Sequence, residues 1–233
     1  MFSTRGPFDI AGDVHGCLEE LLELLAALAY RVERRRDDFS VTPPRGRTLA
    51  FVGDLVDRGP NAPGVLRLAM SMARAGTALC VAGNRDEELV RALKGRTTQV
   101  SRGMALTLDQ LRAEPDGFCQ ESVRFLSRLP DHLVLDEGRL VVVHMGLGEA
   151  MPVDANWAAR ERKRALVVHG HTPVVKPQWL DGAVDIDTGC VYGGHLTALR
   201  YPEQETISIP AKAVYYEPRR PFPMNRVLAR ARK

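Results

Sequence analysis

The chain has 233 residues, 45% of them hydrophobic and 26% charged, which is enough apolar material for one sizeable core. Its most apolar helical stretch, residues 21–29, is too short to cross a bilayer, and residues 1–6 lack a signal-peptide pattern. Four scattered cysteines without a C-x-x-C pair suit a reducing compartment, so we expect a cytoplasmic protein without a membrane partner.

The net charge of +3 is unevenly distributed along the chain. Residues 211–233 carry seven Lys/Arg against one Glu, which leaves the remainder acidic. We predict one domain over residues 1–222 and a basic C-terminal tail over 223–233. A solvated chain end explains such a tail, and contact with nucleic acid is the alternative that its charge leaves open.

The first half alternates short apolar runs with amphipathic segments. Strands are predicted at 8–11, 48–52 and 77–82, and helices at 18–29, 62–75 and 86–93. This alternation predicts a parallel sheet with right-handed crossovers. Each strand ends at a glycine that is followed by Asp13, Asp54 or Asn84. Because open α/β sheets bind ligands beyond the carboxyl ends of their strands, we expect these three side chains to converge.

The second half has shorter apolar runs, which predict mostly antiparallel strands at 133–135, 140–143, 166–168, 183–186, 196–199 and 206–209. A helical pair at 104–129, broken at Pro115-Asp116-Gly117, separates the halves. The charged segment 31–47 is interpreted as a solvated insertion. Two face-to-face sheets with outer helices, an α/β fold, accommodate all of these elements.

Side chains that suit a metal or a phosphate recur at the predicted strand ends. DVHG at 13–16 adds His15 to Asp13, and GDLVDRG at 53–59 adds Arg58, whose forked donors suit a phosphate. His144 and His171 follow two later strands. An isolated member of this set would be an ordinary charged turn or a core histidine, but their recurrence predicts a metal site.

The ligand types indicate which metal ions the site would take. Oxygen and nitrogen ligands without a thiolate favour Mn²⁺, Fe or Zn²⁺. The six residues suit two ions that share one carboxylate, and Asp54, in the middle of the set, is the natural bridge. Two such ions can activate a shared water and neutralise charge on a phosphate during hydrolysis.

Two more motifs complete the set, GN at 83–84 and HMG at 144–146. In type and in order along the chain, the motifs resemble those of the calcineurin-like metallophosphoesterases, and the resemblance covers about residues 8–210. They are most similar to bacterial protein phosphatases, diadenosine-tetraphosphate hydrolases and polynucleotide kinase-phosphatases. The resemblance implies a calcineurin-like double β-sheet sandwich flanked by helices, and attack by a metal-bound hydroxide. It implies one ion on Asp13, His15 and Asp54, a second on Asp54, Asn84, His144 and His171, and Asp187 close to the site.

One position departs from the pattern of this family. Its third motif carries a histidine after Gly-Asn that pairs with an aspartate and is thought to protonate the leaving oxygen, whereas this chain has Arg85. An arginine does not act as a general acid near neutrality. We hypothesise that Arg85 pairs with Asp57 and donates to phosphate, which favours anhydrides and aryl phosphates. Arg160 lies within the segment 145–168, which is shorter than in the polynucleotide-type enzymes, and is a second candidate phosphate contact beside Arg58.

The sequence therefore predicts a metal-dependent phosphatase or phosphohydrolase with two divalent ions, Mn²⁺ being the first choice. Its substrate would be a phosphorylated small molecule or a nucleotide, with dinucleoside polyphosphates among the candidates. One alternative is a protein serine/threonine phosphatase acting on a phosphoprotein. Another is a pseudoenzyme that binds phosphate through an intact metal site, with turnover lost through Arg85.

Overall fold

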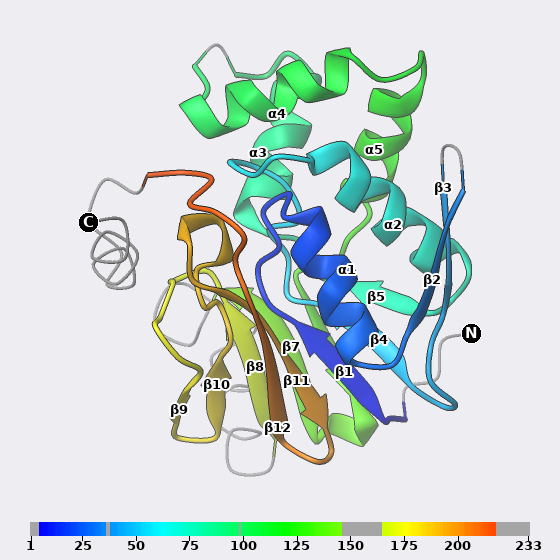
Figure 1. The fold of residues 1–233 in the computed structure, drawn as a ribbon, viewed down its shortest axis with the longest axis vertical. Coiled ribbons are helices and arrows are strands. Elements are labelled where there is room, and N and C mark those ends of the chain that lie inside the picture. The colour runs from blue at the N-terminus through cyan, green and yellow to red at the C-terminus, as the bar shows by residue number, and fades with distance from the viewer. Residues whose placement is uncertain (1–4, 36–37, 98, 146–164, 218–233) are drawn as a thin grey trace.

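The computed structural model describes residues 5–35, 38–97, 99–145 and 165–217, and in it two five-stranded sheets pack face to face (Figure 1). The expected double-sheet α/β sandwich is thus confirmed, whereas the predicted tail at 223–233 lies outside the described residues. The first sheet contains, in spatial order, β12 (Glu205–Pro210), β11 (His195–Tyr201), β1 (Phe8–Ala11), β4 (Thr48–Phe51) and β5 (Ala78–Cys80). The second contains β6 (His132–Leu135), β7 (Leu140–Met145), β8 (Leu166–Gly170), β10 (Ala183–Asp185) and β9 (Gln178–Leu180).

The centre of the first sheet is parallel, as its alternating pattern predicted. β1 pairs with β4, and β4 pairs with β5, both in parallel. The crossovers run through α1 (Leu18–Ala27) and α2 (Ala62–Arg74), which pack on one face of this sheet (Figure 1). α2 begins at Asn61, whose side chain accepts the Gly64 N–H and so caps the first turn. The third helix, α3 (Asn84–Leu93), begins directly after β5 and Gly83.

Four of the six strand pairings in the described second half are antiparallel, as predicted, and the departure lies in the centre of the second sheet. β7 pairs in parallel with β8, and β8 pairs in parallel with β10, so the centre of the second sheet is parallel. β11 and β12 belong to the first sheet instead, where they form an antiparallel pair beside β1. The short strand β9 was not predicted. Apolar runs reveal that strands exist, but strand order depends on pairing between distant segments, which local patterns do not encode.

β1 is buried on both faces, which explains its nearly continuous apolar run. Phe8 and Ile10 face the second sheet, where they pack with Val142 and Val168. Ala11 belongs to a second cluster, with the leucines of α1. Burial of these side chains stabilises the fold by roughly 25 cal/mol for each Å² of apolar surface removed from water. Among the described residues no helix has the length and apolarity that crossing a membrane requires.

The segment 31–47 is solvated along residues 31–35, as predicted, but residues 38–42 are partly buried. It contains a hairpin, β2 (Arg31–Arg35) and β3 (Asp38–Thr42), that packs against α2. Phe39 is buried at 5% exposure because alternate residues of β3 face the helix. The predicted helical pair is present, as α4 (Arg102–Arg112) and α5 (Phe118–Leu126).

A buried charge in the middle of β1 joins several distant segments. Asp9 is fully buried, and its carboxylate lies 3.1 Å from Arg47 Nε and 3.4 Å from Arg200 Nε. The Tyr30 hydroxyl donates to the same carboxylate at 3.0 Å. Arg47 also donates to Glu203 at 2.9 Å, so one guanidinium joins β1 to the turn after β11. A buried carboxylate requires such partners because it has lost its hydration.

We expect Arg47→Met to lower the free energy of unfolding by about 3–5 kcal/mol, because Asp9 would then keep a buried charge with too few partners. Urea denaturation measures the change. Adding Asp9→Asn should recover part of the loss, since the buried charge is removed too. Arg139→Met, which breaks an ion pair of the exposed Arg139 with Asp136, is the matched control and should leave the urea midpoint almost unchanged. An equal, small effect of both arginine substitutions would contradict this account.

Candidate metal centre

The carboxyl ends of five strands deliver polar side chains to one place between the sheets. Asp13, Asp54 and Asn84 follow β1, β4 and β5, while His144 lies on β7 and His171 follows β8. His15 stands on the turn between β1 and α1. The structure brings all six predicted ligands together, since their donor atoms form two groups, in each of which the His and Asp atoms lie within 4.8 Å of one another.

Glycines at the strand ends make this close approach sterically possible. A Cβ on Gly170 would lie 1.9 Å from Asp13 Oδ1, and a Cβ on Gly83 would lie 2.2 Å from Asp54 Oδ1. Any side chain at either position would therefore displace a carboxylate. At Gly83 and Gly170 the missing side chain therefore makes room for a neighbouring ligand, whereas at Gly12 and Gly53 it makes room for the backbone of Ile186 and Gly83.

The first group consists of Asp13, His15 and Asp54. His15 Nδ1 lies 3.0 Å from the Val56 carbonyl, so we assign the proton to Nδ1, which leaves a lone pair on Nε2. That Nε2 atom lies 3.6 Å from Asp54 Oδ2 and 4.0 Å from Asp13 Oδ2. Burial lowers the pKa of His15 to about 4 although the Asp54 charge opposes the shift, so the ring is neutral at pH 7.

The second group consists of Asp54, His144 and His171, with Asn84 beside them. His144 Nδ1 lies 3.1 Å from the Val52 carbonyl, which again leaves the lone pair on Nε2. This Nε2 lies 3.0 Å from Asn84 Oδ1 and 3.3 Å from Asp54 Oδ1. His171 Nδ1 lies 2.9 Å from the same Asn84 oxygen. Acceptor atoms converge here, and a cation satisfies such an arrangement.

Asp54 belongs to both groups, with Oδ2 toward His15 and Oδ1 toward His144. The Arg85 N–H donates to Oδ1 at 2.9 Å and fixes the orientation of the carboxylate. Burial acts to raise the pKa of Asp54, but His144, His15 and the Arg85 N–H outweigh it, and the pKa is lowered. Burial and the Asp187 and Asp54 carboxylates raise the pKa of Asp13. Divalent cations relieve this crowding of negative charge, so the residues fit such ions.

The backbone is strained at several of these residues. His15, Asp54 and His171 have φ of 46°, 48° and 78°, in the left-handed region that non-glycine residues rarely occupy. Asp57 and Arg58 follow with φ of 80° and 71°. Positive φ values of this kind cost of order 1–3 kcal/mol each and gather at functional sites, where the surrounding structure enforces them.

Two arginines meet at Asp57, as the sequence hypothesis for Arg85 required. Arg85 Nε lies 3.5 Å from Asp57 Oδ2, and Arg58 Nε lies 3.2 Å from the same oxygen. Arg85 also donates to Glu88 at 2.8 Å, a partner that we did not predict. Burial raises the pKa of Asp57 to about 6, although both arginines oppose the shift. The amino terminus of α4 covers this cluster, since a Cβ on Gly103 would lie 2.4 Å from Asp57 Oδ1.

Arg58 lies between the first group and two tyrosines. Its Nη1 lies 3.0 Å from His15 Nε2, and its guanidinium carbon lies 5.5 Å from the ring centroid of Tyr192 and 5.8 Å from that of Tyr216. We had not predicted either tyrosine as a site residue. Tyr192 belongs to the segment DTGCVYGG at 187–194, which resembles the polynucleotide kinase-phosphatase and tetraphosphatase group. That resemblance could have marked Tyr192, but nothing local marks Tyr216. Its position comes from residues 211–217, which return to the short helix η2 (Cys190–Tyr192).

Asp187 lies close to Asp13 and Asp54 and is buried, with 3% of its surface exposed. Its carboxylate accepts the Gly189 N–H at 3.0 Å, and burial raises its pKa to about 7, with Asp54 adding to the shift. Asp187 N–H in turn donates to Asp185, which lies 3.9 Å from His169 Nδ1. The carboxylate of Asp187 therefore adds negative charge close to Asp13. The other candidate, Arg160, lies outside the described residues.

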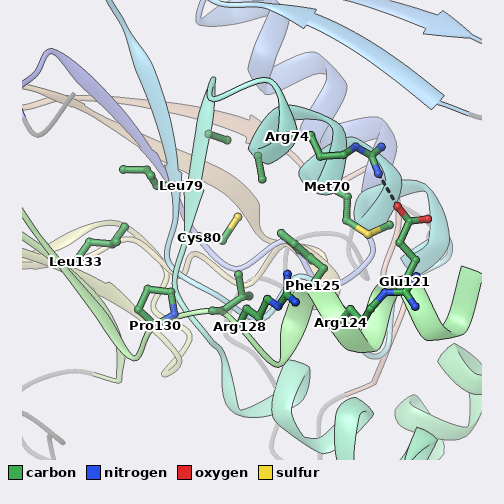
Figure 2. A pocket seen from close by; sticks show the side chains of 13 residues that line it. Met70, Arg74, Leu79, Cys80, Glu121, Arg124, Phe125, Arg128, Pro130 and Leu133 are labelled. Atoms are coloured by element: carbon green, nitrogen blue, oxygen red, sulfur yellow. Dashed lines mark hydrogen bonds and ion pairs between the residues drawn. The ribbon is translucent and has the colours of Figure 1, made fainter. Parts of the chain in front are cut away.

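One cavity in the described part of the structure lies away from this centre. It has a volume of about 730 Å³ and lies beside β5, with Met70, Phe125 and Leu133 among its lining residues (Figure 2). None of the six predicted ligands lines it. A smaller cavity of about 100 Å³ adjoins Asn84 and His144. The convergent acceptors, rather than cavity size, identify the candidate site.

Comparison with known proteins agrees with this geometry. A family model described as calcineurin-like phosphoesterase matches residues 6–204. The bis(5'-nucleosyl)-tetraphosphatase PrpE of Anoxybacillus flavithermus is 38% identical, over 92% of this chain and 99% of its own length. The bis(5'-nucleosyl)-tetraphosphatase PrpE of Halalkalibacterium halodurans is 39% identical, over 88% of this chain and 94% of its own length.

Solved structures share the same architecture. A protein provisionally described as a diadenosine tetraphosphatase superposes with a TM-score of 0.66 at 27% identity, covering 91% of this chain and 96% of its own. A Saccharomyces cerevisiae serine/threonine phosphatase has a TM-score of 0.58 at 15% identity, covering 91% and 81%, and shows likeness of fold alone. The chain belongs to the calcineurin-like phosphoesterase family and is a metal-dependent phosphohydrolase.

Proposed function

We propose that the chain hydrolyses the phosphate anhydride of a dinucleoside polyphosphate, using two divalent ions. One ion would be held by Asp13, His15 and Asp54, and the other by Asp54, Asn84, His144 and His171. The observation that carries the proposal is the shared carboxylate of Asp54, whose two oxygens face two separate groups of ligand atoms. The relatives named bis(5'-nucleosyl)-tetraphosphatase, which match nearly the full chain, support the substrate class.

The ligand set supports Mn²⁺ as the native ion. All six ligands are oxygen or nitrogen donors, and carboxylate and amide oxygens suit a harder ion than thiolates do. When bound, two such ions orient the phosphorus, activate a water and neutralise charge on the attacking and leaving oxygens. We further propose that residues 1–222 form one catalytic domain with a basic tail, and that four free cysteines indicate the reducing cytoplasm.

Arg58 and Arg85 supply positive charge on the side of Asp57. Among the described residues the oxygens of Asp57 and Arg85 Nε have no partner with hydrogen-bond geometry, so charge rather than hydrogen bonding holds these side chains together. His15 Nε2 has one lone pair, so its bond to Arg58 and metal coordination exclude each other. With an ion on His15, this edge of the Arg58 guanidinium would be available to a phosphate.

Arg85 also bears on which bonds are broken. It does not protonate a leaving oxygen, and this loss matters least when the leaving group is a nucleotide phosphate, which departs without a proton. The arginine instead stabilises the negative charge that develops on the phosphate. An anhydride substrate is therefore consistent with this departure from the family pattern, whereas a serine or threonine phosphate requires the missing acid more.

The direct test is hydrolysis of diadenosine tetraphosphate with added Mn²⁺, followed by chromatography of the products. We expect turnover that a chelator abolishes and that Asp54→Asn lowers by at least about 10²-fold, as expected for loss of a key electrostatic group. Asp109→Asn, at an exposed position on α4, is the matched control and should retain full activity. Hydrolysis of phosphopeptides with no cleavage of the dinucleotide would establish the protein-phosphatase alternative, and no turnover of either would establish the pseudoenzyme.

Arg85→His tests the role of the leaving group. We expect the substitution to raise the rate on an alkyl phosphate by about 10²-fold, the lower range for general acid catalysis, with a smaller effect on the tetraphosphate. The ratio of kcat/KM for alkyl and aryl phosphates measures the effect. If the unaltered chain cleaves alkyl phosphates as fast as aryl phosphates, Arg85 does not determine this preference.

Tyr216 tests whether the site also recognises a nucleoside. The partly buried ring flanks Arg58, so a base next to a bound phosphate would lie within reach of it. We expect Tyr216→Ala to raise KM for diadenosine tetraphosphate about fivefold or more, the equivalent of ~1 kcal/mol of stacking. KM for p-nitrophenyl phosphate, which lacks a base, should not change, and Tyr216→Phe should behave as the unaltered chain. Equal changes in both KM values would indicate a structural role.

A further inference from the structure

Two cysteines and a glutamate form a second group of ligand atoms, which the hydrolytic site does not use. The sulfurs of Cys17 and Cys190 and a carboxylate oxygen of Glu20 all lie within 4.8 Å of one another. Cys17 and Glu20 are fully buried, and Cys190 is 2% exposed. Cys17 and Glu20 lie at the start of α1, and Cys190 lies on η2. These two elements are far apart in the chain but pack together.

The carboxylate of Glu20 is only half satisfied. Its Oε1 accepts the Lys212 N–H at 2.9 Å and the Tyr215 hydroxyl at 2.8 Å. Its Oε2 is buried and has no hydrogen-bond partner among the described residues. The Lys212 ammonium pairs instead with Glu23 at 2.8 Å. A buried carboxylate oxygen without a donor is unfavourable, and a cation between this oxygen and the sulfurs would relieve it.

We propose that Cys17, Glu20 and Cys190 form a structural site for a thiophilic divalent ion, with Zn²⁺ as the biological candidate. Two sulfurs and one oxygen are typical zinc ligands, and three protein ligands leave one tetrahedral position for a small molecule such as water. Binding would release the two thiol protons to solvent, and no electron transfer would take place. The site differs in ligand chemistry from the hydrolytic centre, which has only oxygen and nitrogen ligands.

The position of this site gives it a structural consequence. Cys17 follows His15 by two residues, and Cys190 follows Asp187 by three, so an ion here would tie together the two turns that carry these site residues. Through Glu20 it would also hold residues 211–217, which place Tyr216 beside Arg58. The site would therefore position the turns of the catalytic centre without contacting the substrate.

Cobalt absorption separates the two kinds of site. The full chain, stripped of metal with a chelator and fully reduced, is titrated with Co²⁺ alone. We expect an intense near-ultraviolet band from thiolate-to-cobalt charge transfer, which the oxygen and nitrogen ligands of the hydrolytic centre do not produce. Zn²⁺ should abolish the band by displacing the cobalt. Cys17→Ser and Cys190→Ser should each abolish it, and Glu20→Gln should weaken Co²⁺ binding while leaving a thiolate band at higher metal concentration.

Cys119→Ser is the matched control, because Cys119 lies on α5 outside the cluster, and it should keep the full band. Circular dichroism of each metal-free variant distinguishes loss of the site from loss of the fold. Absence of the band in the reduced, folded chain would overturn the proposal, as would its persistence in both Cys17→Ser and Cys190→Ser. The assay does not measure turnover, so it can fail while diadenosine tetraphosphate hydrolysis succeeds, and the converse also holds.

Discussion

The carboxylate of Asp54 lies where two groups of ligand atoms meet, and much of the surrounding structure holds it in that place. Oδ2 faces His15, Oδ1 faces His144, and the Arg85 N–H fixes the group from the third side. Its φ of 48° and the missing Cβ of Gly83 both follow from this position. A buried carboxylate with imidazole lone pairs on two sides is unfavourable without cations. The sandwich therefore has the construction of a fold that binds divalent ions.

Charged groups of opposite sign also meet beside the two ligand groups. Asp57 is buried and pairs with Arg58 and Arg85, which gather positive charge where a phosphate would approach. Asp187 and Asp13 provide negative charge on the side of the first ligand group. Carboxylates thus gather at the two ligand groups and guanidinium groups beside Asp57, a division of charge that suits the proposed phosphate transfer. Arg85, where the family pattern has a histidine, adds to the positive charge beside Asp57.

The C-terminal part of the described chain contacts both α1 and the metal centre. Residues 211–217 return to η2, where Glu20 accepts both the Lys212 N–H and the Tyr215 hydroxyl. This attachment places Tyr216 beside Arg58 and covers the buried cysteines. The segment thus connects α1, through Glu20, with Arg58 at the metal centre. Within β1 itself, the buried Asp9 and its arginines hold in position the strand that leads to Asp13.

Local sequence determined much of the site, because each ligand stands on a strand-turn unit whose apolar run and glycine are contiguous in the chain. Asp13, Asp54 and Asn84 could be placed at one sheet edge since parallel strands share the direction of their carboxyl ends. Helix limits followed from periodicity in the same way, as α2 at Ala62–Arg74 illustrates.

Only the tertiary structure decided which distant segments meet. The parallel centre of the second sheet, the hairpin β2–β3 and the strand β9 depend on pairing and packing that no short window of sequence encodes. The same holds for Arg47 on Asp9 and Tyr216 beside Arg58. The two buried cysteines are ordinary small apolar residues in sequence, and they become a group of ligand atoms because α1 packs against η2 and leaves Glu20 Oε2 without a donor.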